Sequence, residues 1–170
     1  MKKEIELKFF VDDLDPVRRN LKKMKARFEG SFGESDYFFD TPQNTLKKRK
    51  AVLRLRIGDS RHFLTYKENI EKGRFKVSDE YETSFENPKV LLKIFERLGF
   101  RVWFHYAKSP REYWRCRNSL ITLDSFPFGK FIEIEGGPRR IKFIARKLNL
   151  DFSRTSTKSY TQLLKEHRKK

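Results

Sequence analysis

The sequence predicts an α+β fold in which a closed eight-stranded antiparallel β-barrel has a polar, charged lumen and helices packed on its outside. About eight segments alternate apolar and charged residues with the period of two that half-buried strands show. Four other segments carry apolar residues at helical spacing. Each helix needs an apolar strand face to cover, so the charged strand faces are expected to point inward. Closing so long a sheet also removes its edges.

The length of 170 residues predicts a single domain spanning residues 1–170. A net charge of +17 predicts an anionic partner, which on charge alone is a nucleic acid, a nucleotide, a polyphosphate or a membrane surface. The only cysteine, Cys116, excludes an internal disulfide, and the three histidines lack zinc-ligand spacing. Any metal ion is therefore expected to be held by oxygen atoms.

The hydrophobicity of the sequence predicts a location in the cytoplasm. No apolar run approaches the roughly 20 residues that span a bilayer, and a strand pattern opens the sequence where a signal peptide would show its apolar region. A cytoplasmic protein with no membrane partner is therefore expected.

The first element is a strand over residues 4–9, with Glu4, Glu6 and Lys8 on one face and apolar residues on the other. This alternation is also what an ordinary strand with one solvent-exposed face shows. It gains weight because a Glu-x-Glu pattern returns near the other end of the chain, and arginines take the same positions in a strand between them.

The next elements are a helix, a loop and an aromatic strand. An Asp-Pro start and apolar spacing of three and four predict a helix over residues 15–26. Residues 29–35 are rich in glycine and serine, which predicts a loop, and residues 37–42 form a strand that ends at a proline turn. The basic run at 46–50 is interpreted as a solvated turn rather than as a nucleic-acid signal.

A hairpin follows, with strands at 52–57 and 61–68 joined by a turn at 58–60. Arg54 and Arg56 share one face of its first strand, and Lys67 joins them if the registers agree.

The strand over 75–85 then carries Glu80 and Glu82 on either side of a tyrosine. A helix starting at Asn87-Pro88 has the apolar residues Val90, Leu91, Ile94, Phe95 and Leu98. Core packing is expected to account for all of them.

The remaining strands are expected at 100–106, 108–114, 119–125 and 131–135, followed by helices at 139–148 and 158–167. Thr122 and Asp124 share one strand face, as do Glu133 and Glu135 in the strand after it.

The predicted lumen has an unusual composition, because it holds both carboxylates and cations. Its expected side chains are Glu4, Glu6, Lys8, Arg54, Arg56, Lys67, Glu80, Glu82, Arg111, Asp124, Glu133 and Glu135. Arginine matches phosphate oxygens in two-point contacts. Carboxylates repel phosphate unless a divalent cation stands between them, and Mg²⁺ or Mn²⁺ is ordinarily bound by one or two carboxylates and phosphate oxygens. A bound polyphosphate with its metal ion is therefore predicted.

These motifs occur in an order that resembles the CYTH superfamily. They are Glu4-x-Glu6-x-Lys8, the Tyr37 to Pro42 segment, Leu53-Arg54-Leu55-Arg56, Leu64-Thr65-Tyr66-Lys67, Glu80-Tyr81-Glu82, Leu123-Asp124 and Glu133-Ile134-Glu135. The superfamily groups class IV adenylyl cyclases, thiamine triphosphatases and inorganic triphosphatases, whose fold is a triphosphate tunnel barrel. The C-terminal Tyr160-Thr161-Gln162-Leu163-Leu164 is most similar to the class IV adenylyl cyclase-like branch, also called CyaB-like.

The resemblance implies roles for individual residues. The triphosphate would be held by Lys8, Arg54, Arg56, Lys67, Arg111 and Lys158. A metal ion, Mg²⁺ or Mn²⁺, would be held by Glu4, Glu6, Glu80, Glu82, Asp124, Glu133 and Glu135. Catalysis would involve Glu6, Lys67, Tyr37 and Lys108, where Tyr37 orients water with Lys108 or is instead a buried structural residue. The family usually places a lysine two residues before the strand arginine, whereas Lys108 stands three before Arg111.

Two reactions follow from the resemblance, and the sequence leaves the choice open. A cyclase would convert ATP into cyclic AMP and pyrophosphate, whereas a triphosphatase would hydrolyse ATP, thiamine triphosphate or tripolyphosphate. A nucleic-acid-binding module explains the positive charge but not the paired carboxylates, which would repel a phosphate backbone. A triphosphate binder without catalysis is the remaining alternative, and both a monomer and a homodimer are compatible with the sequence.

Overall fold

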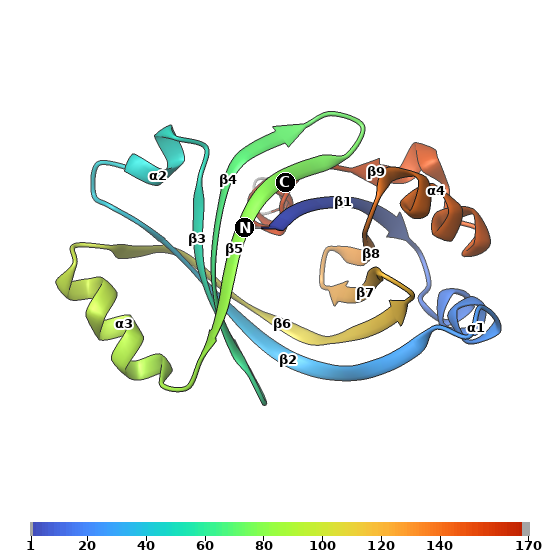
Figure 1. Cartoon of the computed structure of the whole chain (residues 1–170), viewed down its shortest axis with the longest axis horizontal. Helices are drawn as coiled ribbons and strands as arrows, with labels where there is room; N and C mark the ends of the chain where they lie inside the picture. The colour runs from blue at the N-terminus through green and yellow to red at the C-terminus, as the bar shows by residue number, and fades with distance from the viewer. Residues whose placement is uncertain (1, 168–170) are drawn as a thin grey trace. The chain divides into compact units, whose positions relative to one another are not determined.

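The computed structural model describes residues 2–167, apart from the side chains of Lys72 and Lys108. Its strands are β1 Lys2–Val11, β2 Arg27–Asp40, β3 Val52–Gly58, β4 His62–Lys72, β5 Lys76–Phe85, β6 Arg101–Cys116, β7 Ser119–Phe126, β8 Gly129–Glu135 and the two-residue β9 Thr155–Ser156 (Figure 1). Its helices are α1 Asp15–Lys23, α2 Thr45–Lys48, α3 Pro88–Arg97, α4 Pro138–Lys147, α5 Tyr160–His167 and a 3₁₀ turn at Phe152–Arg154. No helix in this range is long and apolar enough to cross a membrane.

The strands form one sheet in the order β5-β4-β3-β2-β6-β7-β8-β1-β9, and β5 also pairs with β1. That last pairing closes the eight long strands on themselves. The registers between β1 and β8, β2 and β3, β3 and β4, β6 and β7, and β7 and β8 are all antiparallel. The predicted fold class, a closed eight-stranded antiparallel barrel with helices outside, is confirmed.

By its internal contacts the described chain divides into two compact units whose segments alternate along the sequence. Unit 1 comprises residues 1–4, 32–71 and 77–108, and unit 2 comprises residues 5–31, 72–76 and 109–170. Each unit is described by itself below, and the single domain expected from the length stays a prediction.

In unit 2 the apolar strand faces lie under helices. Leu7 and Phe9 of β1 are opposite Ile134 and Ile132 of β8, and all four side chains are buried. The core that they build also contains residues of α1 and α4: Val17, Leu21, Ile141, Ile144 and Ala145. Residues of opposite parity, beginning with Lys8 opposite Glu133, lie on the other face of the same strands.

Unit 1 repeats this arrangement with α3. Leu53 and Leu55 of β3 pack with Phe39 of β2 and Phe95 of α3 in a second apolar core. The arginines of β3 alternate with these leucines. Arg54 is opposite Phe38 of β2 and Thr65 of β4, and Arg56 is opposite Asp36 of β2 and Phe63 of β4. Both units therefore carry one apolar strand face and one charged strand face, as the alternation predicts.

Three local predictions are wrong. Residues 29–35 belong to β2 instead of forming a loop, because pairing with neighbouring strands overrides the weak strand preference of glycine and serine. The two strands expected at 100–106 and 108–114 are one strand, β6, which continues through Pro110. The turn expected at 46–50 contains the short helix α2.

The apolar residues of α3 also differ from expectation. Phe95 is buried, whereas Val90, Ile94 and Leu98 are among the most exposed large hydrophobic side chains described. Packing in the core therefore does not account for them.

Candidate functional site

The charged face of unit 2 carries a network that we call the Arg111 cluster, composed of Lys8, Arg111, Asp124, Glu133 and Tyr160. Arg111 of β6 binds the Asp124 carboxylate of β7 through two bonds, Nε to Oδ1 at 2.6 Å and Nη2 to Oδ2 at 2.5 Å. The same Nη2 donates to Glu133 Oε2 of β8 at 2.7 Å. Lys8 of β1 donates to the other oxygen of Glu133 at 2.5 Å. Two cations and two carboxylates from four strands thus meet at one place.

The Arg111 cluster is almost closed to solvent. The residues Lys8, Arg111 and Asp124 are 2%, 5% and 1% exposed. Burial opposes the charge of Arg111, but the carboxylates of Asp124 and Glu133 outweigh it and raise the pKa of Arg111 well above its ordinary value. The Arg111 guanidinium therefore stays charged, and each of the four groups has a partner of opposite sign within hydrogen-bond distance.

Tyr160, the first residue of α5, completes the cluster. Its hydroxyl donates to Asp124 Oδ2 at 2.7 Å, and its ring lies 4.3 Å from the Lys8 Nζ atom. Burial raises the pKa of the Tyr160 hydroxyl well above its ordinary value, and the nearby carboxylates of Glu133 and Asp124 act in the same direction. The hydroxyl therefore remains protonated and serves as a hydrogen-bond donor.

Glu6 and Lys158 also lie in unit 2. Glu6 is opposite Glu135 in the β1–β8 register, and its Oε1 accepts a bond from Lys76 Nζ at 2.7 Å. The Lys158 side chain is exposed and pairs with Glu166, while its backbone oxygen accepts a bond from Lys8 at 3.3 Å. The predicted role of the Lys158 side chain at a triphosphate stays a prediction.

The charged face of unit 1 carries a second network, which we call the Arg56 cluster and which consists of Arg54, Arg56, Lys67 and the carboxylates that they contact. Arg56 of β3 binds Asp36 of β2 through two bonds, Nε to Oδ1 at 2.7 Å and Nη2 to Oδ2 at 2.9 Å. Its Nε also lies 3.1 Å from Glu34 Oε2. This two-point geometry is the one by which an arginine binds a carboxylate or a phosphate.

Arg54, Thr65 and Glu82 form a chain of contacts on the same face. Arg54 Nη2 donates to the Thr65 hydroxyl at 3.0 Å, and this hydroxyl donates to Glu82 Oε2 at 2.8 Å. Arg54 and Glu82 are themselves 3.6 Å apart.

Lys67 lies two residues beyond Thr65 in β4 and so on the same face, as predicted. Its Nζ pairs with Glu4 and lies 3.4 Å from Glu80 Oε1. Glu4 also accepts a bond from the Ser78 hydroxyl at 3.1 Å. Lys67 thus neutralises two of the predicted metal ligands.

Tyr37 lies on the opposite face from these residues. Its partner in the register is Leu55, its side chain packs against the apolar core of unit 1, and its ring stacks on His105 at 4.3 Å between centroids. This placement favours the alternative of a structural tyrosine. The Lys108 side chain lies outside the part of the chain that the structure describes, so its predicted role stays untested.

The carboxylates fit a metal site only in part. Among residues 2–167, no three aspartate, glutamate, histidine or cysteine side chains are grouped to hold a metal ion. Asp124 and Glu133 nevertheless bond the same guanidinium nitrogen, so their oxygens lie within reach of one small cation. Two carboxylates suffice for Mg²⁺ or Mn²⁺ when phosphate oxygens and water complete the shell.

Sequence reasoning missed the partners of the predicted residues. Glu34 was missed because residues 29–35 were predicted to be a loop, and Asp36 because it falls between that loop and the strand predicted from Tyr37. Their spacing of two and the arginines of the next strand were a usable signal. Lys76 follows the same parity as Ser78 and Glu80 in β5. Tyr160 was noted for its family pattern, and only the fold brings it to Asp124.

Comparison with known proteins supports the fold. The model of the CYTH domain family matches residues 2–156. A search of curated proteins gives no match. A candidate adenylate cyclase of Vibrio parahaemolyticus has a similar structure with a TM-score of 0.86 and 24% identity, covering 96% of this chain and 98% of that one.

Two further solved structures resemble the chain. The PH1012 protein of Pyrococcus horikoshii has a TM-score of 0.79 and 28% identity, covering 94% of this chain and 98% of that one. A candidate adenylyl cyclase of Hippeastrum, described as having a dominant triphosphatase activity, has a TM-score of 0.70 and 16% identity, covering 98% of this chain and 96% of that one.

Proposed function

This chain belongs to the CYTH family, and from this premise we propose that it binds a triphosphate together with Mg²⁺ or Mn²⁺ and cleaves it. The observation that carries the proposal is the Arg111 cluster, in which the buried cations Lys8 and Arg111 pair with the buried carboxylate of Asp124 and the half-buried carboxylate of Glu133. Burying charged groups costs free energy, and pairing them often does not repay the loss of hydration. A buried charged cluster therefore indicates a use other than stability.

The cluster suits a metal-bound triphosphate because its partners can be exchanged. Phosphate oxygens would accept hydrogen bonds from Lys8 and Arg111 in place of the carboxylates. Asp124 and Glu133, relieved of those cations, would hold the metal ion that the phosphates bring with them. Each group therefore keeps a partner of opposite charge when the ligand binds.

The Arg56 cluster offers a second set of phosphate ligands. Arg54 and Arg56 of β3 and Lys67 of β4 lie on the same face of two neighbouring strands. Each contacts at least one carboxylate of the same unit. Under the proposal these three cations contact phosphate oxygens, and Glu4, Glu80 and Glu82 are available to balance charge.

Cleavage then follows from charge neutralisation and positioning. Asp124 and Glu133 would hold Mg²⁺ or Mn²⁺, which when bound would supply polarisation of the phosphoryl oxygens. Lys8 and Arg111 hold the phosphate in place and neutralise the charge that develops on its oxygens. Attack by water on the terminal phosphate would give orthophosphate, whereas attack by the ribose 3′-hydroxyl on the α-phosphate of ATP would give cyclic AMP and pyrophosphate.

The two similar structures described as candidate cyclases do not decide between these reactions. One of the two, from Hippeastrum, is also described as having dominant triphosphatase activity. Both are less than 25% identical to this chain, so the likeness concerns the fold. The products must be measured directly.

Phosphorus NMR tests the proposal. The protein is incubated with ATP and with tripolyphosphate, each with Mg²⁺ and with Mn²⁺. Orthophosphate identifies a triphosphatase, and cyclic AMP with pyrophosphate identifies a cyclase. Glu133→Gln is expected to lower the rate by at least about a hundredfold, because it removes a charged ligand from a site that depends on electrostatic stabilisation.

Glu112→Gln is the matched control. Both glutamate side chains are 15% exposed and both pair with an arginine at close range, but Glu112 pairs with Arg18 of α1 on the helix-covered face. Its substitution should leave the rate unchanged. Equal rates in the wild type and in folded Glu133→Gln, or no turnover of any triphosphate by the wild type, would refute the proposed activity.

A further inference from the structure

Helix α3 presents an apolar stripe that the fold leaves exposed. Val90, Ile94 and Leu98 follow one another at intervals of four residues and are 53%, 46% and 66% exposed. Residues at this spacing lie on one side of a helix. The core of unit 1 is contacted from another side of α3, through Phe95 with Leu91 and Leu92. The stripe is thus additional to the face that anchors the helix.

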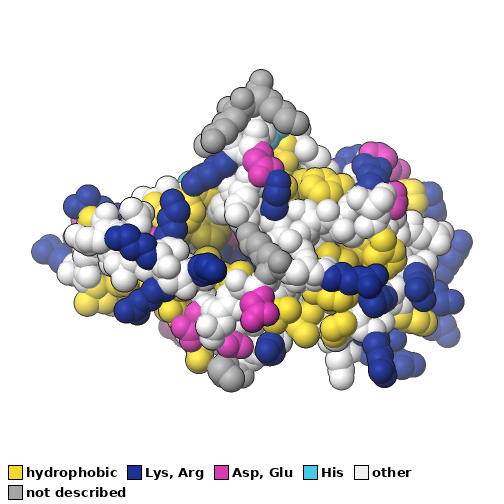
Figure 2. Space-filling model, turned by 90° about the horizontal axis from the view of Figure 1, so that it is seen from above, with side chains coloured by type: hydrophobic (Ala, Val, Ile, Leu, Met, Phe, Trp, Pro, Cys, Tyr) yellow, Lys and Arg dark blue, Asp and Glu magenta, His cyan; other side chains and the backbone are white. Residues whose placement is uncertain are grey.

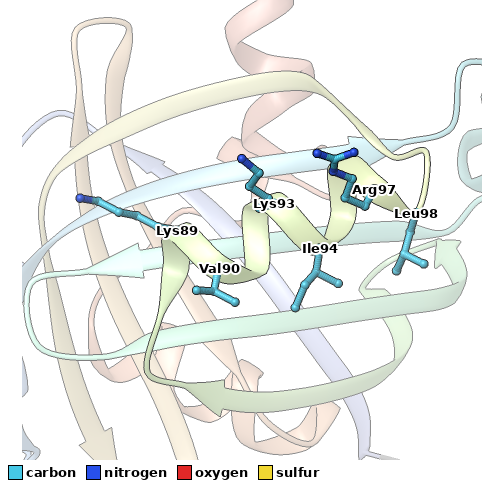
Figure 3. A pocket seen from close by; sticks show the side chains of 6 residues that line it. All are labelled: Lys89, Val90, Lys93, Ile94, Arg97 and Leu98. Atoms are coloured by element: carbon cyan, nitrogen blue, oxygen red, sulfur yellow. The ribbon is translucent and has the colours of Figure 1, made fainter.

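A row of cations runs beside the stripe. Lys89, Lys93 and Arg97 also recur every four residues, each one position before a residue of the stripe, and in Figure 3 they project from α3 in a different direction from the apolar side chains. None of the three forms an ion pair with a described residue, whereas Arg18 of α1 and Lys158 of α5 are both paired. Their charge is therefore available to an external partner.

The hollow along this surface is lined by one helix only. All six of its lining residues belong to the stripe and the row (Figure 3). Within residues 2–167, no second element forms a wall of this hollow that would select a particular protein surface. An adaptable partner that supplies apolar contact and negative charge side by side suits this surface better than a rigid one.

We propose that α3 binds the surface of an anionic phospholipid bilayer. The three aliphatic side chains would enter the boundary between headgroups and acyl chains, and the cations would contact lipid phosphates. The helix would lie on the membrane rather than cross it. Reversible attachment follows from its short length of 10 residues.

A second copy of the chain suits the surface less well. In antiparallel packing of two such helices, equivalent flanks face each other, so the row of cations on one copy would oppose the same row on the other. Like charges in direct opposition are destabilising. A bilayer with anionic headgroups removes this repulsion.

Co-sedimentation with vesicles tests the proposal. The full chain is mixed with vesicles of phosphatidylcholine alone and with vesicles that also contain phosphatidylserine. Binding to the anionic vesicles only is expected. The double variant Ile94→Ser, Leu98→Ser should weaken this binding by about tenfold or more, since it removes two inserted side chains. Lys89→Glu with Lys93→Glu should abolish the preference for anionic vesicles.

Phe143→Ser is the matched control. Phe143 of α4 is 46% exposed, like Ile94, and also lies among basic side chains, since Arg140 and Lys147 contact its ring. Binding should survive this change. An equal loss in the control would show that α3 is not the specific attachment site and would overturn the proposal. Unchanged binding by the double variant would assign the attraction to net charge and would overturn it as well.

Two other results would also overturn it. If the wild type binds neither kind of vesicle, α3 does not bind a bilayer, and its partner would have to be a protein. Dimerisation in light scattering that the double variant removes would identify the partner as a second copy. None of these readouts depends on the proposed triphosphate activity.

Discussion

At the scale of single residues, the charged faces of both units consist of ionised groups that neutralise one another. Arg111 bonds Asp124 and Glu133, and Arg56 bonds Asp36. Removing one member of a buried pair leaves the other unpaired and is strongly destabilising. Substitutions at these sites must therefore be interpreted against a measured stability, and substitutions that keep size and polarity are preferred.

The Tyr160 hydroxyl offers a milder change. Tyr160→Phe keeps the ring but removes the hydrogen bond to Asp124, which should lower the free energy of unfolding by about 1.5–3 kcal/mol, the range for bonds to charged groups. Because Asp124 also holds Arg111, we expect the KM for the triphosphate to rise as well. Urea unfolding and steady-state kinetics measure the two effects.

Tyr66→Phe is the corresponding control, because it removes a hydroxyl that donates to Glu68 at 3.2 Å in unit 1. Its KM should equal that of the wild type. An unchanged KM in Tyr160→Phe would remove Tyr160 from the binding account.

Glu29 predicts a pH dependence of stability. Hydrogen bonds from Arg115, then from Arg27, lower the pKa of its carboxyl below the ordinary value of 4.5. A carboxyl whose pKa is lowered by folding stabilises the folded state at any pH above its ordinary pKa. This contribution is lost as the pH falls through the lowered pKa of the folded state. At neutral pH the wild type should therefore have a higher melting temperature than Glu29→Gln. The difference in melting temperature should disappear as the pH falls below 4.5. A gap that is constant with pH would contradict this account.

At the scale of elements, the sequence predicted most strands and helices because alternation and helical spacing are strong along them. Four of the helices and the hairpin of β3 and β4 lie within a few residues of the expected ranges. The wrong predictions have a common cause, because contacts with residues distant in the sequence determined the structure at those positions. Strand pairing determined residues 29–35 of β2, and α3 contacts the unit 1 core through Leu91, Leu92 and Phe95, which leaves Val90, Ile94 and Leu98 exposed.

The same limit applies to the site. Parity along one strand was enough to place Arg54 and Arg56 on one face, whereas the place of Lys67 beside them depended on the register between β3 and β4. The register of β2 with β3 places Tyr37 on the other face and so favours the structural role that the sequence had left open beside the catalytic one. The contacts of Lys8 and Arg111 with Glu133 depend on register between strands, which a single sequence does not specify.

The start of α3 can be tested as an element. Asn87 caps this helix, since its side-chain oxygen accepts a bond from the Val90 backbone N–H at 3.1 Å. Asn87→Ala should lower the free energy of unfolding by about 1 kcal/mol, whereas Asn87→Asp, which keeps an acceptor, should retain the stability. Urea unfolding compares them, and equal values for the alanine variant and the wild type would show that the cap does not contribute.

At the scale of the whole molecule, positive charge dominates. The chain carries 40 lysines and arginines against 23 aspartates and glutamates, and Figure 2 shows basic side chains spread over the face that it presents, with fewer acidic ones among them. Many of the acidic residues are already paired within the strand faces described above. This excess favours the approach of multiply charged anions and their complexes with metal ions.

The most direct test of the central claim is a crystal structure with Mn²⁺ and a triphosphate whose bridging oxygens resist cleavage, with the metal located by its anomalous scattering. We predict a manganese peak at Asp124 and Glu133, with Lys8 and Arg111 turned from these carboxylates to phosphate oxygens. A bound triphosphate that leaves the four ion-paired groups of the Arg111 cluster joined as they are, with manganese elsewhere or absent, would contradict the account.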